Sequence, residues 1–220
     1  MKNVQKVLIE KLEKLTNKKV SLIEDVATSK YIKPLKLDER LEKRKEEFDK
    51  HVSISGNILT YNSDLSSEVE LLILEKYYKN YTINVNDSIY FEGFVGDGIS
   101  YFELPVKIHK CKDLIITNCR LNSLKNFPDV VEGYIDVSYS SLETLKNFPK
   151  QVSSSIFIEH NNLTSLKGLP DVIEGRLYCQ ENKLRTLEGL PLIIKGDLVI
   201  SDNQLPSNID ESYIRNVCDI

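Results

Sequence analysis

Residues 121–204 consist of four consecutive 21-residue repeats, LNSLKNFPDVVEGYIDVSYSS (121–141), LETLKNFPKQVSSSIFIEHNN (142–162), LTSLKGLPDVIEGRLYCQENK (163–183) and LRTLEGLPLIIKGDLVISDNQ (184–204). The repeats align without a gap. An internal period of this length indicates a solenoid, in which each unit buries its apolar face only by stacking on its neighbours. The sequence therefore predicts a solenoid in the second half of the chain and favours binding over catalysis.

Each column of the repeat has its own chemistry, counted from the first Leu as position 1. Positions 1 and 4 are always Leu, position 8 is always Pro, and positions 11, 15 and 17 are always apolar. Positions 15 and 17 have the period of a strand with one buried face, so we predict one short strand in each turn. Pro cannot donate a backbone hydrogen bond and makes the preceding residue extended. We therefore expect the return segment to be a loop or polyproline-like.

Two further columns predict how the chain bends around the strand. Position 20 is Asn161, Asn182 and Asn203, with Ser140 in the first repeat. We expect these side chains to form a ladder that binds backbone groups where the chain leaves the strand. Position 13 is Gly in three of the four repeats, where we expect backbone freedom or a positive φ.

An imperfect copy precedes the four repeats. Asp113–Leu121 fits the strand part of a turn, with Cys119 in the Asn column. Cys119 is therefore expected to replace a ladder Asn. Cys179, at strand position 17, is expected to be a small core residue rather than a reactive thiol.

The repeat pattern resembles a known family. Leu-x-x-Leu, an apolar-x-apolar strand and Asn-x-Leu, as in Leu177-Tyr178-Cys179 followed by Asn182-Lys183-Leu184, resemble the leucine-rich repeat. One Pro per short turn is similar to the bacterial and phage-encoded members. The resemblance covers about residues 111–205 and implies an α/β solenoid of four full turns and one imperfect turn. Position 11 is apolar and position 12 polar, one residue away from the usual motif, which leaves the strand register open by one residue.

Outside the repeats the chain changes in character. The first 50 residues hold 14 Lys or Arg and 10 Asp or Glu, and helices are expected over Asn3–Asn17 and Asp38–His51. Asn3–Asn17 is amphipathic, and we favour packing of its apolar face on protein over binding to a membrane or nucleic acid. The predicted domains are, in order, a basic, mainly helical arm (1–50), an α+β N-terminal cap (51–112), the leucine-rich repeats (113–205) and a C-terminal cap (206–220).

The predicted N-terminal cap contains patterns of both strand and helix. Val52–Asn62 alternates as a strand does, and Ile83–Phe94 predicts another strand. Between them, Ser66 or Ser67 can cap a helix that runs to about Tyr81.

A short N-terminal stretch suggests the source. Leu12–Glu24, LEKLTNKKVSLIE, resembles a helix-turn-strand stretch that is frequent in tailed-phage proteins. Together with the phage-like repeat, this resemblance implies a phage origin.

Composition argues against a membrane or secreted protein. Of the 220 residues 41% are hydrophobic and 28% charged, the net charge is −4, and no apolar run is long enough for a membrane span. The start MKNVQKVLIEKLEKL reaches Glu10 and Lys11 before an apolar core forms, so no signal peptide is expected. We therefore expect the protein in a virion or in the host cytoplasm.

Catalytic motifs are absent from the sequence. It has no nucleophile elbow, phosphate-binding loop or His-Glu-x-x-His motif, and its cysteines and histidines are dispersed without metal-ligand spacing. We expect no enzyme activity, no cofactor, no metal and no small-molecule substrate.

The variable columns supply a candidate binding surface. If positions 15 and 17 face inward, positions 14, 16 and 18 face outward on the concave side of the sheet. Adjacent aromatic residues bordered by Arg and acidic groups have the composition of a protein-binding hot spot. The alternatives are that cross-strand packing alone explains the aromatic residues, or that the N-terminal arm or a neighbouring copy covers them. The candidate partner-binding residues are Tyr134, Asp136, Phe157, Glu159, Arg176, Tyr178 and Gln180.

Two functions remain open, and both need a protein partner. The chain is either an assembly protein, a structural component of a phage virion that docks by its N-terminal arm, or a soluble adaptor that binds a host protein through the concave face. As a virion component it can oligomerise within a larger assembly. Nucleic acid is disfavoured because the outward face is acidic overall, and Glu188 ends a lysine column at position 5 (Lys125, Lys146, Lys167).

Overall fold

The computed structural model describes residues 37–93 and 101–220. The chain divides into two units, Met1–Glu47 and Phe48–Ile220. The predicted helix over Asp38–His51 is present as α2 (Leu37–Asp49). The predicted helix over Asn3–Asn17 and the phage-like stretch lie outside the described residues.

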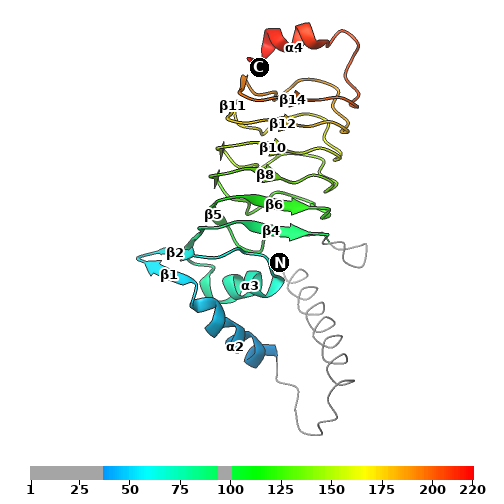
Figure 1. Cartoon of the computed structure of the whole chain (residues 1–220). Helices are drawn as coiled ribbons and strands as arrows, with labels where there is room; N and C mark the ends of the chain where they lie inside the picture. The colour runs from blue at the N-terminus through cyan, green and yellow to red at the C-terminus, as the bar shows by residue number, and fades with distance from the viewer. Residues whose placement is uncertain (1–36, 94–100) are drawn as a thin grey trace. The chain divides into compact units, whose positions relative to one another are not determined.

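The second unit is a parallel β-solenoid of about six turns. One sheet, called the front sheet from here on, has its strands stacked one above another from β4 to β14 (Figure 1). From β6 onward each strand residue pairs with the residue 21 positions along the chain, as Ile156 does with Ile135 and Leu177. The predicted solenoid and its period are therefore confirmed. The front-sheet strands are β4 (Ile89–Glu92), β6 (Leu114–Thr117), β8 (Ile135–Asp136), β10 (Ile156–Phe157), β12 (Leu177–Tyr178) and β14 (Leu198–Val199).

Each turn also contributes a second strand, so the prediction of one strand per turn is wrong. In the repeats this strand covers positions 10 and 11, and Val130 pairs with Gln151 of the next turn. Of these two positions only position 11 is buried in all four repeats, and a strand with a single buried residue shows no strand period in the sequence. The second layer, called the back sheet, has the order β1 (Val52–Ser55), β2 (Ile58–Tyr61), β3 (Thr82–Val85), β5 (Ile108–Cys111), β7 (Val130–Val131), β9 (Gln151–Val152); β11 (Val172–Ile173) and β13 (Ile193–Ile194) form a separate pair.

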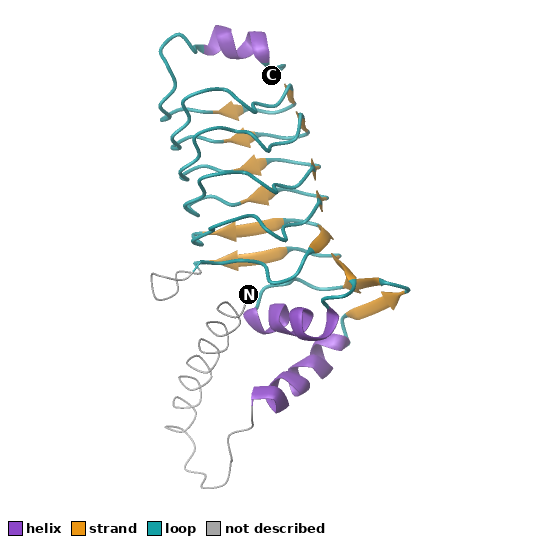
Figure 2. Ribbon diagram, turned by 180° about the vertical axis from the view of Figure 1, so that it is seen from behind, coloured by secondary structure: helices purple, strands orange, loops and turns teal. Residues whose placement is uncertain are grey.

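The repeats contain strands, turns and loops, as Figure 2 shows. Residues 113–205 are all described and none of them is helical, so the expected α/β class is corrected to a β-solenoid. The return segments that contain Pro are turns and loops, as predicted.

The coil extends into the predicted N-terminal cap. β4 and β5 pair with β6 and β7 as the later turns pair with one another. Val52–Asn62 is a hairpin, β1 and β2, rather than one strand, because Gly56 (φ 59°) and Asn57 make a two-residue turn. Ile83–Phe94 is likewise not one strand, since β3 and β4 lie in different sheets.

A short helix follows the hairpin at the β4 end of the stack. Helix α3 (Glu68–Ile73) begins after Ser67, one of the two predicted caps, and a capping box with Glu70 fixes its start. A π-helical segment (Leu74–Tyr78) continues α3 directly. The helical structure therefore ends at Tyr78, slightly before the predicted limit at Tyr81.

The C-terminal residues cover the last strand of the β11–β13 pair. Helix α4 (Glu211–Val217) begins after Asp210, whose side chain accepts a hydrogen bond from Tyr213 N at 2.8 Å. Beyond the helix, Asp219 pairs with Ile193 and so closes the open edge of β13.

The core lies between the two sheets and consists of the invariant columns. Leu145, Ile156 and Leu166 are completely buried, and so is Cys179, as predicted for a core residue. In the last turn, Leu198 and its neighbours are only half-buried because no further turn stacks on them. Each fully buried Leu or Ile contributes about 1.5–3 kcal/mol to folding.

Position 20 forms the predicted ladder. Asn161 Oδ1 accepts hydrogen bonds from the backbone N–H groups of Ser140 and Leu142 at 3.0 and 2.9 Å. Its Nδ2 donates to the carbonyl groups of Val137 in the preceding turn and Ile158 in its own, both at 3.0 Å. The other members also donate to a carbonyl of the preceding turn: Cys119, Ser140, Asn182 and Asn203.

Glycine at position 13 has a different cause from the one expected. Gly175 has no positive φ, but a Cβ there would lie 2.6 Å from Ser155 N of the neighbouring turn. Close approach of adjacent turns, rather than left-handed backbone, therefore requires the glycine. The left-handed glycines of the repeats are Gly168 and Gly189 at position 6.

Candidate functional site: the outer face of the front sheet

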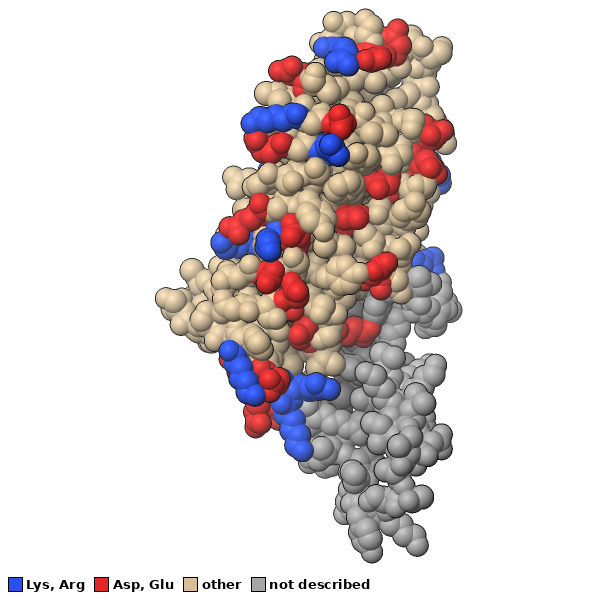
Figure 3. All heavy atoms as spheres, viewed as in Figure 1, with Lys and Arg blue, Asp and Glu red and all other residues tan. Residues whose placement is uncertain are grey.

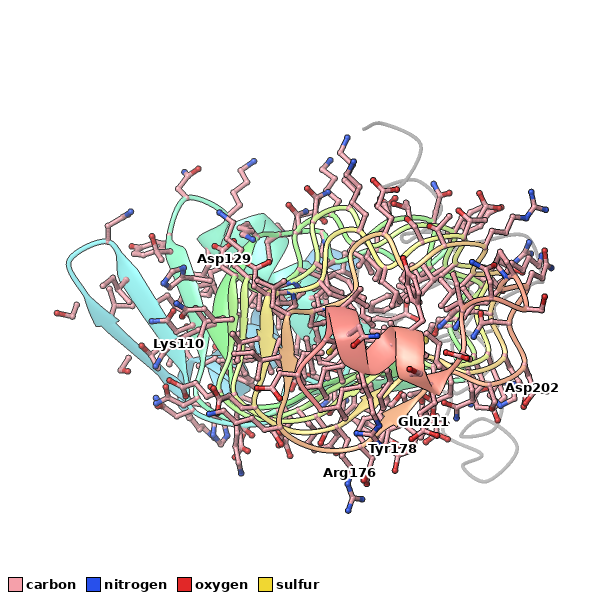
Figure 4. The ribbon with its side chains drawn as sticks, turned by 90° about the horizontal axis from the view of Figure 1, so that it is seen from above. Lys110, Asp129, Arg176, Tyr178, Asp202 and Glu211 are labelled. Carbon is pink, nitrogen blue, oxygen red and sulfur yellow. The ribbon has the colours of Figure 1, made fainter. Side chains whose placement is uncertain are left out.

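The outer face of the front sheet carries all seven predicted partner-binding residues. Positions 15 and 17 of the inner turns are buried while position 16 is only half-buried, so the register read from the sequence holds. In Figure 4 Arg176 and Tyr178 project from the same side of the coil, away from Lys110 and Asp129. Asp136, Phe157 and Tyr178 form the paired row at position 16, with Tyr134 and Arg176 at position 14 and Glu159 and Gln180 at position 18.

Three aromatic rings are in contact on this face. The ring centroids of Phe157 and Tyr178 are 5.1 Å apart and the rings are stacked, with an interplanar angle of 21°. Tyr134 meets Phe157 edge to face at 6.1 Å. Such pairs contribute about 0.5–1.5 kcal/mol beyond their buried area, so cross-strand packing accounts for part of this arrangement. The rings nevertheless remain half-exposed, and we call them the aromatic cluster.

The position 16 row extends beyond the predicted residues. Tyr90 of β4 pairs with Ile115, which pairs in turn with Asp136. Tyr90 is exposed, and its hydroxyl donates a hydrogen bond to Glu92. Sequence reasoning missed Tyr90 because the Leu and Pro columns that set the register do not reach β4.

The two charged side chains at the centre of this face, Arg176 and Asp136, already have partners within the chain. Arg176 Nε lies 3.0 Å from Asp197 Oδ2 in the next turn, in a pair exposed to solvent. Asp136 Oδ1 accepts hydrogen bonds from the backbone and hydroxyl groups of Ser138 at 3.0 and 2.6 Å. Asp136 thus also stabilises the local turn.

Position 18 carries two buried acceptor atoms. Glu159 Oε2 and Gln180 Oε1 have no hydrogen-bond partner in the part of the chain that the structure describes. Burial raises the pKa of the Glu159 carboxyl, and the charge of Asp136 raises it further. A donor from a partner would satisfy these oxygens if the two side chains rotate outward.

A column of left-handed residues borders the face at position 19. Tyr139 and His160 are stacked there with centroids 4.1 Å apart, and His160 Nδ1 lies 2.9 Å from Glu181 Oε2. Sequence reasoning missed this column. Its members include Asn, Asp and His and no β-branched residue, and this composition favours a left-handed backbone. The members, all with φ of 52–54°, are Asn118, Tyr139, His160, Glu181 and Asp202.

Lysines elsewhere on the coil pair with acids of adjacent turns. Lys110 Nζ lies 2.9 Å from Glu132 Oε1, and Lys195 Nζ lies 2.6 Å from Glu174 Oε2. In the lysine column, Lys167 pairs with Glu188 at 3.3 Å. The visible surface consequently carries both signs of charge close together (Figure 3), and such exposed pairs contribute only about 0–1 kcal/mol each.

Reactive groups are not gathered elsewhere in residues 37–93 and 101–220. Within these ranges no three His, Cys, Asp or Glu side chains are grouped to hold a metal ion. The four cysteines are buried and none is in a disulfide, and burial raises the pKa of Cys179. None of the helices in the same ranges has the length and apolar character that crossing a bilayer requires.

Comparison of the chain with protein-family models, curated proteins and solved structures finds no significant match.

Proposed function

We propose that the chain is a non-enzymatic protein-interaction module that binds a protein partner through the outer face of the front sheet. The observation that carries this proposal is the half-exposed aromatic cluster of Tyr134, Phe157 and Tyr178. The core and ladder positions of the repeat account for the fold. The aromatic cluster lies at positions 14 and 16, which belong to neither. Aromatic rings with few rotatable bonds lose little entropy when a partner covers them.

The border of the cluster indicates the chemistry of the partner. Asp136, Glu159 and Glu181 surround it, and Arg176 is already paired with Asp197. A complementary surface would place an apolar or aromatic group on the rings and N–H donors or basic side chains on the acidic border. The same acidic border repels phosphate, which argues against nucleic acid as the partner.

The repeat class of the module is part of the proposal. The invariant Leu columns, the buried positions 15 and 17 and the Asn ladder support a leucine-rich repeat of the short, Pro-containing kind. Repeat proteins of this kind use the extended surface of their stacked units for binding.

The biological setting rests on the sequence resemblance to tailed-phage proteins. We place the chain in a phage virion as an assembly component that docks by its basic N-terminal arm, with a soluble host-binding adaptor as the alternative. Mass spectrometry of purified particles separates the two: a virion component is present at fixed stoichiometry, whereas an adaptor is absent from particles and captured with a host protein.

A paired comparison of variants tests the binding face. We expect the double variant Phe157→Ser/Tyr178→Ser to retain the solenoid and lose its partner, because hot-spot residues each contribute about 2 kcal/mol or more. The measurement is quantitative mass spectrometry of proteins captured by the full chain from lysate of the source cells.

The matched control is Leu192→Ser/Tyr213→Ser, which removes two exposed apolar side chains away from the aromatic cluster. This variant should capture the same proteins as the wild type. Capture that is unchanged in the face variant, while circular dichroism shows an intact fold, would contradict the proposal.

A further inference from the structure

Among the strands that the structure describes, β1 ends the back sheet, and none of them pairs with its outer edge. β1 is the outermost strand in the order β1-β2-β3, and it pairs antiparallel with β2 over four consecutive residue pairs without a bulge. Edge strands are usually protected from further pairing by charged residues, proline or a bulge. The hairpin Val52–Tyr61 contains no charged residue and no proline.

The hydrogen-bond pattern shows which backbone groups face outward. Asn62 N donates to His51 O at 2.8 Å, so these residues form a hydrogen-bonded pair. Because such pairs alternate along an antiparallel ladder, Ser53 and Ser55 bond to β2. The N–H and C=O groups of Val52 and Ile54 therefore point away from β2, toward the open edge.

The side chains of β1 alternate between the two faces of the sheet with the same two-residue period. Val52 and Ile54 lie on the face of Leu59 and Tyr61, which are buried, but Ile54 extends past this core and is 49% exposed. Ser53 and Ser55 lie on the opposite face and are exposed. The same two residues thus present both the outward backbone groups and the outward extension of the apolar face.

We propose that β1 pairs antiparallel with β1 of a second copy of the chain, in the register centred on Ser53. In this register Val52 of each copy faces Ile54 of the other, and the two pairs form four backbone hydrogen bonds. The apolar face continues across the two-fold axis, whereas a shift by one residue would place Ile54 among serines and mispair the backbone.

Charge does not oppose a second copy at this edge, as it does elsewhere on the surface. The chain has a net charge of −4, so most contacts between identical surfaces bring acidic groups together. The hairpin is a corner without charge, as the tan protrusion beside β1 and β2 shows in Figure 3. A two-fold pairing of one strand with itself is also closed, so it yields a dimer rather than a fibre.

Cysteine cross-linking tests this register with the full chain. In the proposed pairing the two Ser53 residues are a non-hydrogen-bonded pair with Cα atoms about 4.5 Å apart, within the range that a disulfide spans. Mild oxidation of Ser53→Cys should therefore give a covalent dimer on a non-reducing gel. The native cysteines are buried and should not contribute.

Two further variants make the result decisive. Ser55→Cys is the matched control, because two residues at this position would be about 14 Å apart in the proposed register and should not cross-link. Adding Ile54→Lys to Ser53→Cys should abolish the cross-link by placing like charges at the edge. The proposal is overturned if Ser53→Cys stays monomeric across a concentration series, if Ser55→Cys cross-links equally, or if Ile54→Lys has no effect.

Discussion

Replacing Asn161 by alanine is expected to lower the free energy of unfolding by about 3–5 kcal/mol, because buried backbone groups lose their partners. The side chain is 7% exposed, and its amide bonds to backbone groups of two adjacent turns. Alanine removes the acceptor for Ser140 N and Leu142 N and the donor for Val137 O. Urea unfolding followed by circular dichroism measures the change.

The neighbouring residue supplies the control for this prediction. Asn162 is half-buried, and its backbone N–H donates a hydrogen bond to Leu142 O, which alanine retains. Asn162→Ala should therefore change stability by about 0.5 kcal/mol or less. Equal effects of the two substitutions would show that the ladder does not hold the turns together.

Gly168→Ala is expected to destabilise the solenoid by about 3 kcal/mol or more. Gly168 has a φ of 120°, which L residues rarely adopt, and a Cβ there would lie 2.5 Å from Leu145 O of the preceding turn. The obstacle is backbone rather than a flexible side chain, so the turns must separate to accommodate the methyl group. Thermal unfolding of the purified variant measures the loss.

A second glycine separates the strain of the backbone from the clash. Gly93 has a φ of 65°, and a Cβ there would meet nothing within 4 Å. Gly93→Ala should therefore cost only about 1–2 kcal/mol, the penalty of the left-handed conformation alone. If Gly168→Ala lowers the free energy of unfolding by no more than Gly93→Ala does, the close approach of the turns at Gly168 is contradicted.

The repeated columns explain why much of the fold could be predicted. Each core or ladder position occurs four times, so the assignment of Asn161 as a ladder residue and of Cys179 as a core residue did not depend on one local pattern. Both assignments agree with the structure. The outward direction of Phe157 and Tyr178 followed from the same register.

The features that escaped prediction depend on contacts between turns. The second strand of each turn forms because Val130 and Gln151 meet across the stack, although neither has a strand pattern of its own. Gly175 at position 13 is required by the backbone of the neighbouring turn, which no single repeat contains. Tyr90 lies on the outer face because β4 pairs with β6, a pairing that the repeat columns do not reach.

The N-terminal part was less predictable because it has no repeat to set its register. Val52–Ser55 alternates as a strand does, but the Gly56-Asn57 turn and the adjacent apolar residues Ile58 and Leu59 interrupt the alternation, and the segment is a hairpin. By contrast, the start of α3 could be narrowed to Ser66 or Ser67 because capping depends on local residues, and Ser67 is the cap.

Site-specific photo-cross-linking tests the central claim, that the outer face of the front sheet contacts a protein partner. A photoreactive phenylalanine analogue is placed at Tyr178 in the aromatic cluster and, as a control, at the exposed Thr186, which lies outside positions 14, 16 and 18. Irradiation in lysate of the source cells should give a discrete adduct from position 178 and none from position 186. An adduct from position 186 alone, or none from position 178 while the chain stays folded, would contradict the claim.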